Sequence, residues 1–186
     1  MNKPLQAVHT ADQAFKIDIQ TIRSNAREHV MNGAQTEGYS ADCETIIKHL
    51  NAALATEIVC SLRYKRHYFT AKGLNSKGIA DEFNLHAQEE LAHADLIAER
   101  IVQLGGEPDF APDTLVSRSH ADYVPCTDLQ EMIKENLVAE RIAIDVYHEF
   151  ISYIGDSDST TRRMLEGILA TEEEHADELA DWLKRT

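Results

Sequence analysis

Apolar residues recur every three or four positions through four long stretches of the chain, which is the spacing of amphipathic α-helices. All four prolines lie outside these stretches, and glycines follow the first three of them. Proline cannot continue a helix, and glycine favours the turn that ends one. The pattern therefore predicts four long helices, running from an Asp42 cap to about Lys72, from about Ile79 to Leu104, from about Thr127 to Ile154, and from a Ser157 or Ser159 cap to about Arg185.

A shorter amphipathic pattern precedes these four helices. Its apolar residues, again three or four positions apart, are Phe15, Ile19, Ile22, Ala26 and Val30. This spacing predicts a helix over roughly 12–31, and the polar stretch over 32–40 is typical of a loop. We therefore divide the chain into an N-terminal extension over 1–41, whose helix we expect to dock on something larger, and a helical bundle over 42–186.

The lengths of the connections predict how the four long helices are arranged. The segments over 73–78 and 155–157 are too short for anything but turns between antiparallel neighbours. A long helix of this kind spans roughly 40 Å, and the segment over 105–126 reaches roughly 70 Å when extended. Since that segment also holds three of the prolines, we expect it to be a crossover and not a fifth core helix. The predicted fold is all-α: two antiparallel helical hairpins joined by one long crossover.

Composition and charge exclude several classes of function. The chain carries 18 basic and 32 acidic residues, a net charge of −14, which repels phosphate backbones and makes nucleic acid an unlikely partner. No apolar run is long enough to cross a membrane, and the first residues lack the apolar core of a signal peptide. The three cysteines, Cys43, Cys60 and Cys126, have neither a metal-like spacing nor the number that a disulfide framework needs. We therefore expect a cytoplasmic protein.

A glutamate interrupts the apolar face of each long helix near its middle. These residues are Glu57, Glu90, Glu140 and Glu172. Four like charges in one core repel one another, and each buried ion costs several kcal/mol, whereas two divalent cations would cancel all four charges. His93 and His175 each lie three residues after a glutamate, on the same helical face, where both side chains can hold one ion. Carboxylates with imidazoles suit iron or manganese better than a metal that prefers thiolates.

The same pattern occurs in both halves of the chain. Each Glu-x-x-His is preceded, at nearly the same distance, by the other glutamate of its hairpin. Tyr64 and Tyr147 follow those upstream glutamates at equal distances. A single Glu-x-x-His occurs by chance in acidic helices, but a repeated one with matching neighbours indicates a pseudo-symmetric pair of metals.

On these residues, the chain over about 42–185 resembles the ferritin-like superfamily, and most closely its bacterioferritin-type di-iron site. The resemblance implies that one iron is held by Glu57 and His93, the other by Glu140 and His175, and that both are bridged by Glu90 and Glu172. It also implies that Tyr64 and Tyr147 hydrogen-bond to ligands. The implied activity is that of a ferroxidase, which oxidises Fe(II) with O2 or H2O2 and stores ferric mineral inside a homo-oligomeric cage.

Three differences refine the resemblance. Leu91 stands where bacterioferritin has its haem-ligating methionine, so haem is not expected. Little chain follows His175, which leaves no room for the fifth helix of 24-subunit ferritins and favours a dodecameric, Dps-like cage. All six ligands fit within one chain, whereas Dps proteins build their site between two subunits. The chain thus resembles Dps-like proteins with a bacterioferritin-type centre, although only Cys60 lies near Glu57 where some of them have a cysteine pair.

Other readings stay open. A di-manganese catalase or a peroxidase-like oxidase would use the same ligands without storing iron. The rubrerythrin form of such a peroxidase is excluded, because its extra iron needs four cysteines and the chain has three. A Dps-type protein that protects DNA and a bundle without metal are the remaining alternatives. His86 has no counterpart in the second hairpin and is interpreted as a core or channel histidine. Cys60 is interpreted as a small buried hydrophobic residue.

Overall fold

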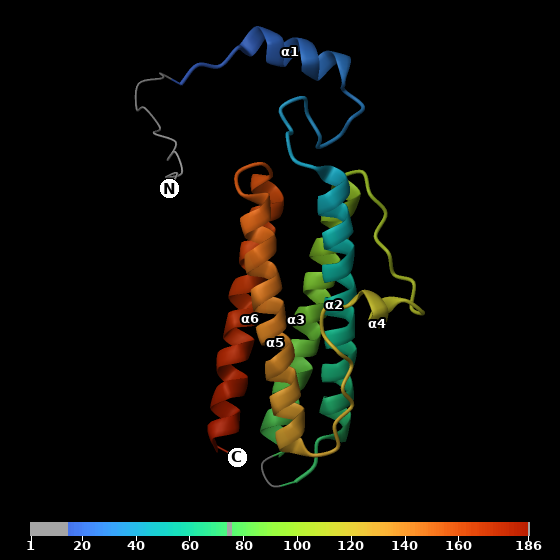
Figure 1. The fold of residues 1–186 in the computed structure, drawn as a ribbon, viewed down its shortest axis with the longest axis vertical. Helices are drawn as coiled ribbons and strands as arrows, with labels where there is room; N and C mark the ends of the chain where they lie inside the picture. The colour runs from blue at the N-terminus through green and yellow to red at the C-terminus, as the bar shows by residue number, and fades with distance from the viewer. Residues whose placement is uncertain (1–14, 74–75, 186) are drawn as a thin grey trace, which may run out of the picture. The chain divides into compact units, whose positions relative to one another are not determined.

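The computed structural model describes residues 15–73 and 76–185, and its described regular structure is entirely helical (Figure 1). The helices are α1 (Ile19–Glu28), α2 (Cys43–Thr70), α3 (Ser76–Gln103), α4 (Leu115–Arg118), α5 (Leu129–Ile154) and α6 (Ser159–Arg185). The chain divides into two compact units, and the boundary between them along the chain lies between Glu37 and Gly38. The predicted all-α class is confirmed. Among the described residues, no helix has the length and apolar character that crossing a membrane requires.

The first unit contains α1, which is shorter than the helix expected over 12–31. The helix begins after Asp18, whose carboxylate accepts a hydrogen bond from the backbone N–H of Thr21 at 3.1 Å. It ends at His29, where a turn closed by the N–H of Asn32 takes over. Residues 12–14 lie outside the described part of the chain. The prediction was too long because apolar spacing alone does not mark where caps and turns stop a helix.

The second unit is a bundle of the four long helices. Helix α2 packs along α3, and α5 packs along α6, so each hairpin is antiparallel as the short turns require (Figure 1). The segment between α3 and α5 runs back along the bundle and contains α4, a single turn that lies against α2. Its buried Leu115 contacts Ala55 and Val59 of α2, outside the main core. The expected crossover is therefore present, with one short helix that the prolines had not suggested.

Side-chain caps explain where most of the helices begin. Asp42 begins α2 as predicted, with its carboxylate accepting from the N–H of Thr45 at 3.2 Å. Helix α5 begins two residues later than predicted because Asp128 is its cap. For α6, the expected cap at Ser157 or Ser159 is wrong, since the carboxylate of Asp158 accepts from the backbone N–H of Thr161 at 2.9 Å.

Asp158 is held in place by the rest of the bundle. It forms a buried ion pair with Arg100 of α3 at 2.9 Å and accepts a hydrogen bond from the Tyr39 hydroxyl at 2.7 Å. Burial alone would raise the pKa of Asp158, but hydrogen bonds from Thr161, together with those from Tyr39 and Arg100, lower it to about 2. A serine at this position could not form an ion pair with Arg100, so the contact with α3 depends on the aspartate.

The apolar core of the bundle is divided in two. One cluster near the start of α2 includes Leu50, Ile97 and Leu165, and another near its end includes Phe83, Ile133 and Leu179. Each long helix contributes one of the four core glutamates, and this glutamate lies between the two clusters along the helix. A polar layer therefore crosses the bundle at mid-height, enclosed by close-packed apolar residues above and below.

Candidate metal centre

Each of the four long helices contributes a glutamate to this polar layer, and α3 and α6 each add a histidine. The six residues predicted as ligands are 0% to 7% exposed, and they form two groups in which the ligand atoms lie within 4.8 Å of one another. One group is Glu57, Glu90, His93 and Glu172, and the other is Glu90, Glu140, Glu172 and His175. Glu90 and Glu172 belong to both groups. This is the arrangement that two neighbouring cations with two bridging carboxylates require.

Both imidazoles direct Nδ1 toward the carboxylates. Nδ1 of His93 lies 2.9 Å from an oxygen of Glu172 and 3.4 Å from one of Glu57. Nδ1 of His175 lies 3.6 Å from Glu172 and 3.8 Å from Glu90. The spacing of three residues therefore places each histidine on the face of its own helix's glutamate, as the sequence indicated.

Several buried atoms of the layer lie near one another but have no hydrogen-bond partner within the described part of the chain. They are Glu57 Oε2, Glu90 Oε1, both carboxylate oxygens of Glu172, and Nδ1 of His93 and of His175. A buried polar atom left unpaired costs about 1–3 kcal/mol. Here such atoms come from all six predicted ligands except Glu140, and they converge on one space. Bound cations would satisfy them together.

Two tyrosines orient Glu57 and Glu140, the two carboxylates that each belong to only one of the two ligand groups. Tyr64 of α2 donates its hydroxyl proton to Glu140 of α5, and Tyr147 of α5 donates to Glu57 of α2. Both rings are buried. The two bonds cross the bundle in opposite directions, so the structure reproduces the repeat seen in the sequence.

The pKa shifts describe the centre without metal. Burial and repulsion from Glu172 raise the pKa of Glu90 and of Glu140 well above its usual range. Burial also disfavours the charged form of His93, but the nearby carboxylates of Glu172 and Glu57 outweigh this effect and raise its pKa to about 10. The neighbouring imidazoles of His175 and His93 lower the pKa of Glu172 to about 2 against the effect of burial. Without bound cations, these carboxylates and imidazoles would hold protons that metal binding displaces.

The structure adds residues that sequence reasoning did not assign to the centre. Glu89 lies 2.9 Å from Nε2 of His175 and can accept its proton. A metal-ligating histidine commonly donates its other N–H in this way, which leaves Nδ1 free to bind the ion. His86 is fully buried, and its ring stacks on His175 with the centroids 3.9 Å apart. No spacing signal marked either residue.

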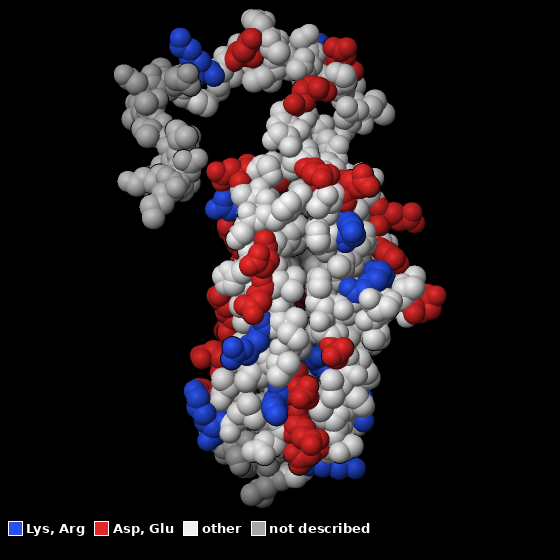
Figure 2. Space-filling model, in the orientation of Figure 1, with Lys and Arg blue, Asp and Glu red and all other residues white. Residues whose placement is uncertain are grey.

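The cysteines and the charged side chains of the surface contribute none of the six predicted ligands. Cys60 is buried against Ala121 and Ala139, as expected, and burial raises the pKa of its thiol. None of the three cysteines, all of which lie in the described part of the chain, forms a disulfide. Acidic side chains are spread over the visible face of the bundle and outnumber basic ones, which form no continuous patch there (Figure 2).

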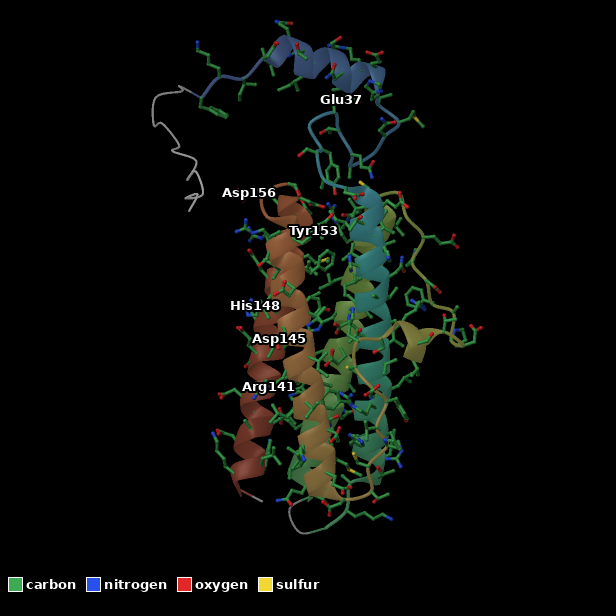
Figure 3. All side chains as sticks on the ribbon, viewed as in Figure 1. Glu37, Arg141, Asp145, His148, Tyr153 and Asp156 are labelled. Atoms are coloured by element: carbon green, nitrogen blue, oxygen red, sulfur yellow. The ribbon has the colours of Figure 1, made fainter. Side chains whose placement is uncertain are left out.

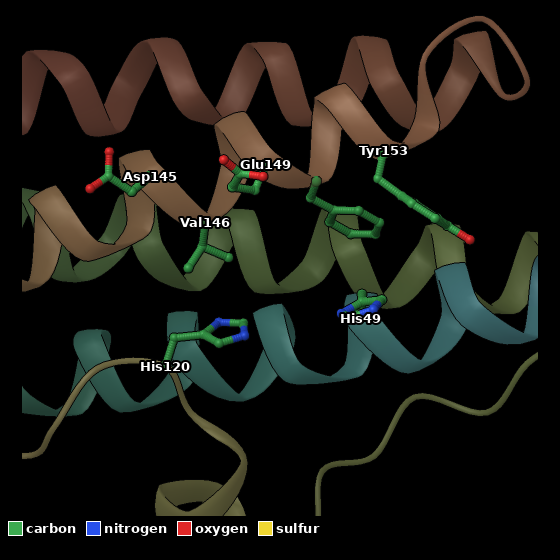
Figure 4. Close-up of a pocket in the computed structure, with 7 residues that line it drawn as sticks. His49, His120, Asp145, Val146, Glu149 and Tyr153 are labelled. Carbon is green, nitrogen blue, oxygen red and sulfur yellow. The ribbon is translucent and has the colours of Figure 1, made fainter. Parts of the chain in front are cut away.

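A separate pocket of about 460 Å³ opens beside the centre, and none of the six predicted ligands lines it. Its lining residues are His49, His120, Asp145, Val146, Glu149, Phe150 and Tyr153 (Figure 4). His49 lies on α2, His120 on the crossover, and the others on α5, where Figure 3 shows Asp145 and Tyr153. Nδ1 of His120 is 3.1 Å from the hydroxyl of Thr56, the neighbour of Glu57.

Comparison with known proteins gives consistent matches. The profile of a family described as ferritin-like domain matches residues 47–186. The chain is 29% identical over 160 residues to a nutrient stress-induced DNA-binding protein of Synechococcus, covering 81% of this chain and 85% of that protein. It is 28% identical over 131 residues to a bacterioferritin of Desulfovibrio desulfuricans, covering 70% of this chain and 69% of the other.

Solved structures agree with the sequence matches. A dodecameric thioferritin, the bacterioferritin-related protein of Bacteroides fragilis, superposes with a TM-score of 0.75 at 34% identity, covering 77% of this chain and 87% of that one. Dps of Thermosynechococcus elongatus superposes with a TM-score of 0.72 at 21% identity, covering 75% and 90%, and shows the fold alone.

Proposed function

The chain belongs to the ferritin-like domain family, as a Dps-like mini-ferritin, and on this premise we propose that it is a ferroxidase with a di-iron centre inside each subunit. Its relatives include bacterioferritins, which supports a role in iron storage and oxidation. The observation that carries the proposal is the convergence of six buried donors from four helices of one chain.

The donor set fits two ferrous ions. Two divalent cations balance the charge of four carboxylates, and oxygen and imidazole donors without thiolate suit iron or manganese. Glu57 and His93 would hold one ion, Glu140 and His175 would hold the other, and Glu90 and Glu172 would lie between the two. When bound, the two Fe(II) supply one electron each to O2 or H2O2.

The surrounding residues position these ligands. Tyr147 and Tyr64 hold the carboxylates of Glu57 and Glu140 in place, and Glu89 fixes the proton of His175 on Nε2. Such outer partners raise ligand basicity and keep the ligands aligned before metal arrives. The apolar clusters on both sides exclude bulk water from the layer and strengthen its electrostatic interactions.

We further propose that the chain assembles into a dodecameric cage that retains ferric mineral. The Bacteroides fragilis relative is described as dodecameric and has the highest identity among the structures compared above. A DNA-protecting role is the second candidate, because two curated relatives are named as DNA-binding or DNA-protecting proteins. The net charge of −14 opposes binding to phosphate backbones. A gel shift at low salt decides this second role, and retarded DNA would support it.

The test of the proposed function is anaerobic loading with Fe(II), followed by air or H2O2, with ferric absorbance as the signal. The wild type, Glu90→Gln and the exposed control Glu99→Gln of the same helix are compared. We expect rapid oxidation of two irons per chain in the wild type and in the control, and its loss in Glu90→Gln. Light scattering on the same samples reports particle mass. Oxidation that is slow and unchanged by Glu90→Gln would overturn the iron assignment, and bound manganese with catalase activity would replace it.

A further inference from the structure

A second group of potential ligands lies next to the centre, toward the surface of α3 and α6. Nε2 of His86 is 2.9 Å from an oxygen of Glu178 and 3.6 Å from one of Glu82. The ligand atoms of all three residues lie within 4.8 Å of one another. The His86 side chain is 0% exposed, whereas Glu82 and Glu178 are 26% and 42% exposed. A buried imidazole thus faces two carboxylates that solvent can reach.

The hydrogen bonds of Tyr64 determine which nitrogen of His86 carries a proton. The hydroxyl proton of Tyr64 is donated to Glu140, so its oxygen can only accept from other groups. Nδ1 of His86 lies 3.3 Å from that oxygen and is therefore the donor. In the neutral ring, Nε2 is then left with a lone pair. That lone pair and the oxygens of Glu82 and Glu178 are three acceptors that point at one another.

We propose that Glu82, His86 and Glu178 bind a third divalent cation, separate from the two positions of the centre. Two carboxylates neutralise a doubly charged ion, and one imidazole with carboxylates is a donor set suited to Fe(II), Mn(II) or Co(II). The exposed side of the group leaves room for water ligands.

His86 also connects the third position to the centre. It forms another group with Glu140 and His175, in which the ligand atoms again lie within 4.8 Å of one another. An ion at the outer carboxylates is therefore one side chain away from the half of the centre that contains Glu140. If the protein is a ferroxidase as proposed, this position supplies Fe(II) to that half.

Counting bound Co(II) under anaerobic conditions tests the site without any oxidation chemistry. The variants are Glu82→Gln/Glu178→Gln and the control pair Glu99→Gln/Glu174→Gln, which removes the same charge from exposed positions of the same two helices. We expect three tightly bound equivalents per chain in the wild type and in the control. In Glu82→Gln/Glu178→Gln we expect only two, because the affinity of the third position falls by at least about tenfold. Equal stoichiometry in all three proteins would overturn the third site. Circular dichroism establishes that each variant is folded.

The supply role has a separate readout. With limiting Fe(II), the initial rate of oxidation should fall by about tenfold in Glu82→Gln/Glu178→Gln, while the amount finally oxidised at the centre is unchanged. An unchanged rate would overturn the supply role and leave the Co(II) count to decide on the site. A wild type that oxidises no iron would overturn the proposed function, and the Co(II) count would still test the third site by itself.

Discussion

Replacing Glu140 by glutamine should stabilise the protein without metal and reduce its response to metal. The carboxylate is 1% exposed, lies in the group shared with Glu90 and Glu172, and has a pKa raised by burial and by repulsion from Glu172. Glutamine has the same shape and keeps an oxygen that accepts from Tyr64. It removes only the charge, so we expect the free energy of unfolding to rise by about 1–3 kcal/mol at neutral pH.

The magnitude can be read from thermal denaturation in the presence of EDTA. For a chain of this size, 1 kcal/mol corresponds to about 2–4 °C, so the melting temperature of Glu140→Gln should rise by about 2–12 °C. At a Co(II) concentration of about 100 times the Kd of the wild type, the free energy of unfolding of the wild type should rise by about 2.7 kcal/mol. The free energy of unfolding of the variant should rise by less. Adding metal should therefore reduce the advantage of the variant, and should reverse the order of stability where that advantage lies well below about 2.7 kcal/mol. The exposed Glu149→Gln on the same helix serves as the control and should change neither value.

The pH dependence gives a second check on the same variant. A raised pKa means that the folded state binds the proton of Glu140 more tightly than the unfolded state does. The cost of the carboxylate is therefore absent below the usual pKa of 4.5 and grows as the pH rises toward the folded value. The advantage of Glu140→Gln should shrink as the pH approaches 4.5. A variant that is less stable than wild type in EDTA at neutral pH would refute this reasoning, and so would an undiminished response to Co(II).

Three further predictions test the surroundings. Tyr64→Phe and Tyr147→Phe should each weaken Co(II) binding by about 10–100-fold, because each removes a donor to a ligand carboxylate; unchanged titration curves would contradict this. Metal binding should release at least one proton per chain at pH 7, since the pKa of His93 is raised to about 10, and affinity should rise with pH; calorimetry in two buffers measures this, and a release of zero counts against it. Asp158→Ala should lower the unfolding free energy in urea by about 3–5 kcal/mol by leaving Arg100 buried and unpaired, and a change below about 1 kcal/mol would show that the pair contributes little.

The long helices could be predicted because their apolar spacing extends over many turns and glycines mark their ends. Gly155, for example, ends α5 with a φ of +52°. The cap of α6 was not predictable in this way, because Asp158 is selected by Arg100 from a distant part of the chain. The single turn of α4 was missed for a similar reason, since only its contact with α2 explains it.

The candidate ligands were identifiable because each one breaks an apolar face and because the pattern repeats. Their roles as ligands remain predictions, although the structure brings all six together. Glu82, Glu89 and Glu178 gave no such signal, since each lies on a partly exposed face where acidic residues are common. Glu82 lies four residues before His86 on α3, a spacing that places both on one helical face. Glu178 and Glu89 each contact a histidine of the other helix, and only the packing of α3 against α6 brings these pairs together.

His86 makes the two halves of the centre unequal. It lies one helical turn before Glu90 in α3, and the corresponding residue before Glu172 in α6 is the buried Ile168. The half with Glu140 therefore borders a polar imidazole, whereas Ile168 and His93 line the same pocket on the other side. An imidazole can hold or pass on a cation, and an isoleucine cannot. The two cations should consequently bind with different affinities despite near-identical ligands, and His86→Leu should bring the two affinities closer together in a Co(II) titration.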